Sequence, residues 1–256
     1  YRYRLTTEAG ELLKIDPYAR QVTSSVGNAV IYDHAAFDWE DDDVVAPDHN
    51  ALVIYELHIG SFYVPSEESG GNLELVMEKL DHLERLGVNA IQVMPVMEFA
   101  GDRSWGYNPA HIFAVESTYG GPDAFKTFVR EAHKRGMAVI LDVVYNHLGP
   151  SDLDLWRFDG WSENDKGGIY FYNDDRSQTP WGDTRPDYGR EEVRRFLHDN
   201  AMSWLHDYHL DGLRFDMTPY IRSVHANGYD LPEGWDLMRW INLSLREEFP
   251  DRISIA

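Results

Sequence analysis

From residue 51 onward, short apolar runs alternate with amphipathic segments of helical periodicity, and this alternation constrains the fold most. The runs expected to form strands are 51–62, 88–96, 137–147, 210–216 and 252–256. The segments expected to form helices lie between them, at 72–87, 122–136, 190–209 and 235–249. A chain that alternates strand and helix in this way predicts a parallel sheet covered by helices, the α/β class.

Local signals support the expected elements. Asn72 can cap the start of the first helix and Gly87 its end. The run 88–96 is treated as a continuous apolar run, which is typical of parallel strands covered on both faces, and 137–147 is expected to be another buried strand. Apolar residues on one face of the first helix recur every three or four positions, at Leu73, Val76, Met77, Leu80, Leu83 and Leu86.

Two folds are built from repeated strand–helix units, the doubly wound open sheet and the eight-stranded barrel. A doubly wound sheet with a dinucleotide site requires a glycine-rich turn after its first strand. The segment "HIGSFYVPSEESGG", at the end of the first strand, lacks that fingerprint. We therefore expect a (β/α)8 TIM barrel, of which these residues supply about the first five strands.

Residues 1–50 have a different pattern of apolar and turn residues. Their short apolar stretches, "ELLKIDPYA" and "GNAVIYD", are broken by turn residues, and an acidic run follows at 38–43. We expect residues 1–50 to be the end of a small N-terminal β domain plus a linker. Residues 51–256 are then the N-terminal part of the barrel.

Composition narrows the choice of partners. The formal net charge of −21 argues against nucleic acid and anionic membranes, because both bind basic surfaces. No apolar run approaches the length of a membrane-spanning helix, and the first residues do not form a signal peptide. The chain has no cysteine, which fits a reducing compartment and excludes disulfides and a cysteine nucleophile.

Polar residues gather where the expected strands end. In a barrel, functional groups lie at the C-terminal ends of the strands and in the loops that follow. The strand-end residues are Asp142, Asn146, His147, Arg214 and Asp216, and the loop "SWGYNP" after the second strand adds Trp105, Tyr107 and Asn108.

The pair Arg214 and Asp216 suggests a particular chemistry. Alternation along a strand puts both side chains on one face, where an arginine favours the ionised form of a neighbouring carboxylate. Such a carboxylate is a good nucleophile or cation stabiliser, which a retaining glycosidase needs opposite the anomeric carbon. Tyr107 could stack on a sugar ring, and His147 and Asp142 could hydrogen-bond its hydroxyls.

Each feature also has a plainer interpretation. Arg214 and Asp216 could be a structural ion pair, Asp142 could cap a loop, and His147 could be a structural histidine. "SWGYNP" could be only a turn, since Gly and Asn-Pro favour turns. A functional site is favoured because all these groups fall at the same end of successive strands.

Three motifs closely resemble those of the α-amylase superfamily of retaining glycoside hydrolases and transglycosylases. They are "DVVYNH" at 142–147, "GLRFD" at 212–216 and "WGYNP" at 105–109. The resemblance implies that Asp216 is the catalytic nucleophile and Arg214 its ionic partner. The substrate-binding residues it implies are Trp105, Tyr107, Asp142, Asn146 and His147.

The segment "LLKIDPYARQV" is similar to the exit from the β-sandwich module that precedes the barrel in glycogen branching enzymes and trehalose-releasing hydrolases. This subgroup implies an intracellular, cytoplasmic enzyme. Asn146 matches a position that helps to bind structural calcium in many amylases, whereas the subgroup generally does without that ion. We therefore expect no metal and no other cofactor, with calcium allowed but not expected.

The resemblance implies an enzyme that acts on an α-glucan such as glycogen, starch or a maltooligosaccharide. A 1,4-α-glucan branching enzyme of glycogen biosynthesis is the first interpretation, because of the N-terminal module. The alternatives are a maltooligosyl-trehalose trehalohydrolase and an α-amylase-type hydrolase. A non-catalytic glucan-binding barrel is the alternative from another class, and a barrel without any ligand is least favoured.

The family's general acid is a glutamate that follows the fifth strand, expected here directly after 252–256. Residues 1–256 contain neither this glutamate nor the later His-Asp region. General acid catalysis contributes roughly 10²–10⁴-fold to the rate. We expect residues 1–256 alone to be inactive and poorly stable.

Overall fold

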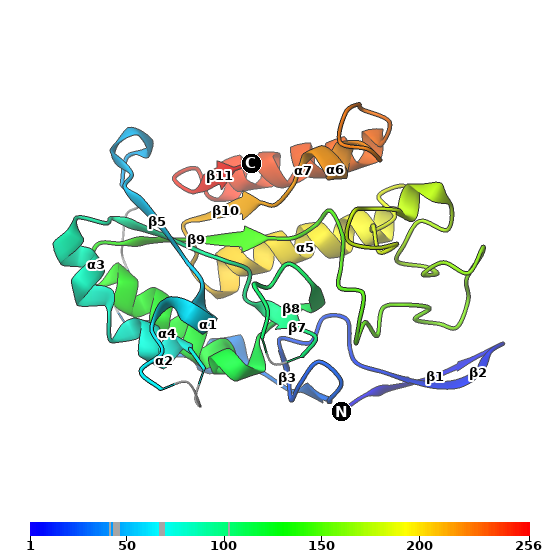
Figure 1. The fold of residues 1–256 in the computed structure, drawn as a ribbon, viewed down its shortest axis with the longest axis horizontal. Helices are drawn as coiled ribbons and strands as arrows, with labels where there is room; N and C mark the ends of the chain where they lie inside the picture. Colours follow the sequence, from blue (N-terminus) through cyan, green and yellow to red (C-terminus); the bar gives the residue numbers. More distant parts are fainter. Residues whose placement is uncertain (41, 43–46, 67–69, 102) are drawn as a thin grey trace.

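Five parallel strands form the centre of the molecule in a computed structural model that describes residues 1–40, 42, 47–66, 70–101 and 103–256. They are β5 (Ile54–Leu57), β6 (Ala90–Val93), β9 (Ala138–Val143), β10 (Gly212–Phe215) and β11 (Ile253–Ile255). Each strand pairs in parallel with the next along the chain (Figure 1). A doubly wound sheet reverses its strand order, whereas a barrel does not. The arrangement confirms the α/β class and is part of a (β/α)8 barrel.

Helices connect the strands where the sequence predicts them. They are α2 (Leu73–Met77), α3 (Leu80–Leu86), α4 (Gly121–His133), α5 (Glu191–Asp207) and α7 (Pro232–Glu248). Asn72 caps α2 by accepting a hydrogen bond from the Leu75 amide at 3.0 Å, and Gly87 ends α3 in the left-handed conformation.

Two expectations for the first connection were wrong. The single helix expected at 72–87 is two helices, because the regular i to i−4 hydrogen bonds are interrupted at Glu78 and Lys79, where the Lys79 amide donates to the Val76 carbonyl. Leu86 is 59% exposed, so the last position of the predicted apolar stripe is not part of the core. Similarly, the run 51–62 is a strand only at β5, after which it turns into the short helix α1 (Ile59–Phe62).

Two elements were not expected. An antiparallel hairpin of β7 (Met97–Phe99) and β8 (Pro109–Val115) is inserted between β6 and α4. A short helix, α6 (Pro219–Arg222), follows β10. The hairpin loop carries the "WGYNP" motif, and α6 begins three residues after Asp216, so both border the ends of the central strands.

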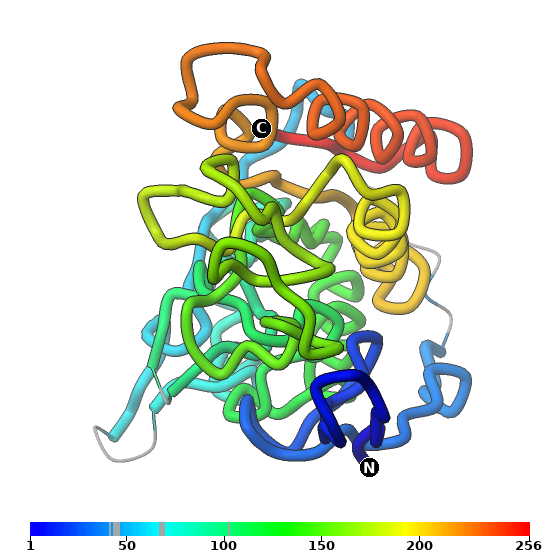
Figure 2. The backbone as a smooth tube through the Cα atoms, turned by 90° about the vertical axis from the view of Figure 1, so that its right-hand side faces the viewer, coloured from blue at the N-terminus to red at the C-terminus, as the bar shows by residue number. Residues whose placement is uncertain are grey.

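Two small antiparallel hairpins precede the barrel, β1 (Tyr3–Thr7) with β2 (Gly10–Lys14) and β3 (Gln21–Val22) with β4 (Ala29–Val30). Lys14 donates to the carbonyl of Asp154 at 2.8 Å, and this contact joins the hairpins to the long loop 148–190. The two chain ends lie at opposite ends of the molecule (Figure 2).

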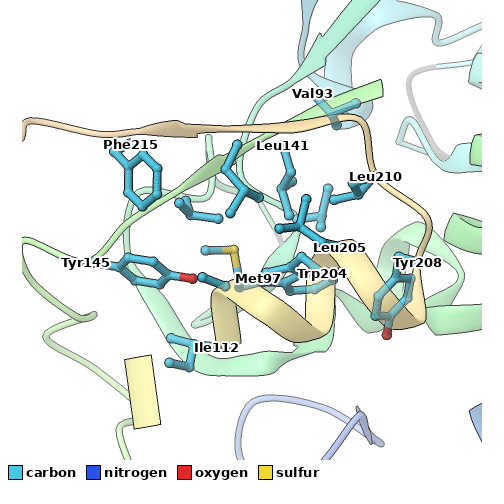
Figure 3. Close-up of a cluster of buried hydrophobic side chains, with 14 of the residues drawn as sticks. Val93, Met97, Ile112, Leu141, Tyr145, Trp204, Leu205, Tyr208, Leu210 and Phe215 are labelled. Carbon is cyan, nitrogen blue, oxygen red and sulfur yellow. The ribbon is translucent and has the colours of Figure 1, made fainter. Parts of the chain in front are cut away.

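The core lies between the sheet and its helices. Figure 3 shows Leu141 and Phe215 of the sheet facing Trp204 and Leu205 of α5, and all four are almost fully buried. Because side chains alternate along a strand, the residues between them point to the other face of the sheet. That face holds small apolar residues such as Ala138 at the start of the strands, and polar residues at their ends.

Candidate active site

The register of the sheet brings Arg214 and Asp142 together. The two residues are direct partners in the parallel ladder between β10 and β9. Arg214 Nη1 donates to Asp142 Oδ1 at 3.0 Å and Oδ2 at 2.8 Å, and to Asp216 Oδ1 at 2.8 Å. One guanidinium nitrogen therefore faces two carboxylates, which are 0% and 7% exposed for Asp142 and Asp216.

Burial and charge act against each other in this cluster. Burial raises the pKa of Asp142 to about 6, although the hydrogen bonds and charge of Arg214 act to lower it. Burial also opposes the charge on Arg214, but the two carboxylates more than offset this and raise its pKa. Two carboxylates share one arginine, so the site holds more negative charge than a simple ion pair.

Tyr107 reaches the cluster from the hairpin loop. Its hydroxyl donates to Asp142 Oδ2 at 2.8 Å, and burial together with Asp142 raises its pKa. Gly106 makes this approach feasible, because its φ is +89° and a Cβ there would lie 2.2 Å from the Pro95 carbonyl oxygen. Only glycine fits where the loop crosses Pro95.

Asn146 and His147 join the loop after β9 to Asp216. Asn146 Nδ2 donates to the Asp216 carbonyl at 2.9 Å and to its Oδ2 at 3.1 Å. His147 Nδ1 lies 2.5 Å from Asn146 Oδ1, and its Nε2 lies 2.8 Å from the Tyr107 carbonyl. Burial lowers the pKa of His147 to about 4, while the Tyr107 hydrogen bond and the charge of Asp216 act in the opposite direction.

These contacts affect whether Asn146 can act as a calcium ligand. Both polar atoms of the Asn146 side chain are engaged by Asp216 and His147, which leaves no oxygen turned outward as a ligand. Within the described part of the chain, no group of three or more acidic or histidine side chains is arranged to hold a metal ion. The residues present do not fit a calcium site at this position.

The remaining predicted residues lie further from the cluster. Trp105 is 69% exposed and makes no ring contact with any described aromatic residue. Asn108 accepts a hydrogen bond from Ser104 within the hairpin loop, so its side chain fixes the loop.

Two aromatic residues at the site were not singled out from the sequence. Trp181 stacks on His147, with ring centroids 4.7 Å apart and planes at 15°. Tyr220 of α6 meets the edge of Trp181 at 5.3 Å. The only signal in the sequence was the richness of loop 148–190 in Trp and Tyr, which does not tell which ring faces the site.

The arrangement suits sugar chemistry. An ionised carboxylate beside an arginine can attack or stabilise a cationic carbon centre. Tyr107 and Trp181 supply aromatic surface near the cluster, and His147 holds this surface together through its contacts with the Tyr107 carbonyl and the Trp181 ring. None of the described helices is both long and apolar enough to cross a membrane.

The fold and the site together define part of an α/β barrel whose strand ends carry a carboxylate–arginine cluster. Residues 48–153 match the family model described as the alpha amylase catalytic domain. This match confirms the resemblance to the alpha-amylase family that the sequence motifs indicate.

Individual relatives fall into two groups. A malto-oligosyltrehalose trehalohydrolase of Saccharolobus solfataricus is 43% identical over 192 residues, which are 74% of this chain and 30% of that protein. A 1,4-alpha-glucan branching enzyme, GlgB, of Picrophilus torridus is 38% identical over 274 residues, covering 100% of this chain and 37% of that protein. The chain spans about a third of the length of the curated relatives that it matches.

Solved structures show the same fold. The catalytic module of SpuA, described as a multi-modular glycogen-degrading pneumococcal virulence factor, has a TM-score of 0.78 and 26% identity. The match covers 99% of this chain and 40% of that one. The likeness therefore includes the N-terminal hairpins as well as the barrel strands.

Proposed function

We propose that the protein containing these residues cleaves α-1,4-linked glucan by double displacement, with Asp216 as the nucleophile. The observation that carries this proposal is the single Arg214 nitrogen shared between Asp142 and Asp216 at the ends of β9 and β10. Its hydrogen bond to Asp216 Oδ1 holds the carboxylate that must attack the anomeric carbon.

The reaction proceeds in two balanced steps. In the first, Asp216 forms a glycosyl ester while the bond to the leaving oxygen breaks and that oxygen takes a proton from a general acid. The resemblance described above implies that this acid follows residue 256, so its identity belongs to the proposal for the whole protein. In the second step the same group, now a base, takes a proton from the acceptor hydroxyl as it displaces Asp216.

The other residues have separable roles in this scheme. Asp142 offers carboxylate oxygens to sugar hydroxyls, and Tyr107 offers a ring to the sugar at the cleaved bond. His147 lines the same subsite, where a sugar hydroxyl would take the place of its contact with Asn146 or with the Tyr107 carbonyl. Asn146, which was expected to bind substrate, orients Asp216 in this proposal.

The acceptor decides the particular activity, and we propose a sugar hydroxyl, which makes the protein a branching enzyme of glycogen synthesis acting in the cytoplasm. The branching-enzyme relatives support this, since the match to GlgB of Picrophilus torridus extends over the entire chain. Release of trehalose to water is the second candidate, because the trehalohydrolase relatives are more identical, at 43% against 38%.

The test is product analysis on the complete natural polypeptide with amylose and with maltooligosyl-trehalose. A branching enzyme lowers the iodine stain of amylose and creates α-1,6 linkages without releasing reducing sugar. A trehalohydrolase releases free trehalose from the second substrate. Glucan binding without any turnover would contradict the proposal and favour a non-catalytic binding barrel.

A further inference from the structure

Arg185 is a fully buried arginine without an acidic partner. It is 0% exposed, and no carboxylate of the described residues lies within 4 Å of its guanidinium. A buried charge of this kind is costly unless its donors are satisfied. Arg185 lies in loop 148–190, four residues after Trp181, so the bonds of its guanidinium bear on the position of that aromatic residue.

Backbone carbonyls surround the guanidinium on all sides. Two belong to the same loop, Arg176 at 2.7 Å from Nε and Gln178 at 2.6 Å from Nη2. Three belong to α6 and the residues after it, namely Tyr220, Ser223 at 3.2 Å and Val224 at 2.9 Å. An arginine has five N–H donors in a fixed planar fork, so these five acceptors match its donors in number.

The two segments joined in this way carry the outer aromatic residues of the site. The loop presents Trp181 on the ring of His147, and α6 presents Tyr220 against the edge of Trp181. Trp181 itself is fixed in a tight turn, where its amide donates to Thr179 Oγ1 at 3.2 Å. Thr184, which follows the turn, also pairs with Leu148, whose amide donates to the Thr184 carbonyl at 3.1 Å, but this bond does not reach α6.

We propose that Arg185 is a positioning residue that locks Trp181 and Tyr220 in place as one wall of the sugar-binding site beside His147 and Asp216. This inference rests on the proposed glucan activity. It adds a determinant of sugar binding that touches neither the sugar nor the reacting atoms. A lysine cannot replace Arg185, because three donors on a flexible stem cannot serve five carbonyls on two segments.

The test compares Arg185→Lys with wild type in the complete natural polypeptide. Hydrogen exchange at the amides of 177–182 and 220–224 should become at least tenfold faster in Arg185→Lys. The matched control is Arg157→Lys in the same loop, whose side chain is 39% exposed and donates to the Lys166 carbonyl; it should leave both segments unchanged. If Arg185→Lys does not fold, Arg185→Gln replaces it; with only two donors for five carbonyls, it should also make exchange faster in the same segments.

Kinetics separate positioning from a general loss of stability. KM for a maltooligosaccharide should rise about tenfold in Arg185→Lys, with kcat changed less than about threefold. The double variant with Trp181→Ala should have the KM of Trp181→Ala alone, because Arg185 acts through Trp181. Additive effects on KM, or unchanged exchange in both segments, would overturn the role of Arg185.

The two proposals fail in different ways. A wild-type protein that neither binds nor turns over glucan overturns the proposed function, and the sugar-binding role of Arg185 falls with it. In that case the exchange data still decide whether Arg185 holds the two segments together. An active Arg185→Lys protein with wild-type KM and exchange overturns only the role of Arg185.

Discussion

At the scale of single residues, Asn146 decides how the Asp216 carboxylate is held. Its side-chain amide donates to the Asp216 carbonyl and to Oδ2, while Arg214 holds Oδ1. Asn146→Ala removes both of the amide's bonds to Asp216. Loss of one preorganised donor in an active site typically costs about 10²-fold or more in kcat. We expect kcat on maltooligosaccharide to fall by about 10², with KM little changed, in steady-state assays.

The matched control is Asn242→Ala on α7, where the asparagine amide donates only to the Met238 carbonyl. This variant should keep wild-type kcat. Equal losses of kcat in the two variants would show that Asn146 has no special relation to Asp216.

Glu98 in β7 gives the protein a pH-dependent stability. Its side chain is 2% exposed, and burial together with the charge of Glu116 raises its pKa to about 8 from an ordinary 4.5. A raised carboxyl pKa means that the folded state prefers the neutral form, so this contribution to stability is full below pH 4.5 and is lost as pH rises through about 8. At about 1.4 kcal/mol per pKa unit, the loss should exceed about 2 kcal/mol.

Glu98→Gln mimics the neutral form at every pH. Its Tm should therefore exceed that of wild type by a margin that grows between pH 6 and pH 9, as measured by calorimetry. Glu74→Gln, at an exposed position of α2, should show no such trend. A constant difference in Tm across this range would contradict the buried neutral Glu98.

At the scale of elements, the loop between β7 and β8 depends on Gly106. Alanine there would combine a φ of +89° with a Cβ 2.2 Å from the Pro95 carbonyl oxygen. We expect Gly106→Ala to lower the free energy of unfolding by at least about 2 kcal/mol and to raise KM, because Tyr107 is displaced from Asp142. Denaturant unfolding and kinetics on the same samples measure both effects.

Gly101 offers a control within the same loop. Its φ is +83°, but a Cβ would meet nothing within 4 Å. Gly101→Ala should thus cost only the strain of a left-handed residue, about 1 kcal/mol, and leave KM unchanged. If the two variants lose the same stability and keep the same KM, the close approach of Gly106 to Pro95 has no consequence.

The sequence correctly predicted the strands and helices in which apolar residues follow a regular pattern. Strands β6 and β9 are apolar except for Gln92 and Asp142, and α5 carries a clear stripe, so their patterns depend little on distant contacts. The hairpin of β7 and β8 escaped prediction because its two strands are separated by a polar loop and pair only with each other. Its position follows from tertiary packing, which a local pattern does not encode.

Some residues of the candidate site could also be predicted from the sequence, and others could not. Arg214 and Asp142 could be predicted to share an edge, because they end neighbouring parallel strands. Trp181, Tyr220 and Arg185 could not, since they lie in irregular segments whose course is set by hydrogen bonds to distant carbonyls. The prediction that Asn146 contacts substrate missed its bond to Asp216 for the same reason.

At the scale of the whole molecule, the sheet has two open edges in the part of the chain that the structure describes. Among these residues, strand β5 pairs only with β6, and β11 pairs only with β10. Open strand edges template pairing with other chains. Residues 1–256 produced alone should therefore self-associate and show no glucan turnover, as judged by light scattering and a reducing-sugar assay.

A monodisperse monomer with measurable turnover would contradict this expectation. A variant at the edge of the sheet tests the cause of self-association. Val53 lies beside β5 and is 53% exposed, and replacing it with a charged residue should reduce self-association if the β5 edge is responsible. The exposed Leu243 of α7 provides the comparison, because it lies on a helix and not on a strand edge.

The measurement that tests the central claim most directly is covalent trapping of the nucleophile. The complete natural polypeptide would be incubated with a fluorinated α-maltosyl fluoride, which forms the glycosyl ester quickly and releases it slowly. Peptide mass spectrometry should then find one glycosyl adduct, on Asp216, and none in Asp216→Asn. An adduct on another residue, or undiminished turnover by Asp216→Asn, would contradict the account.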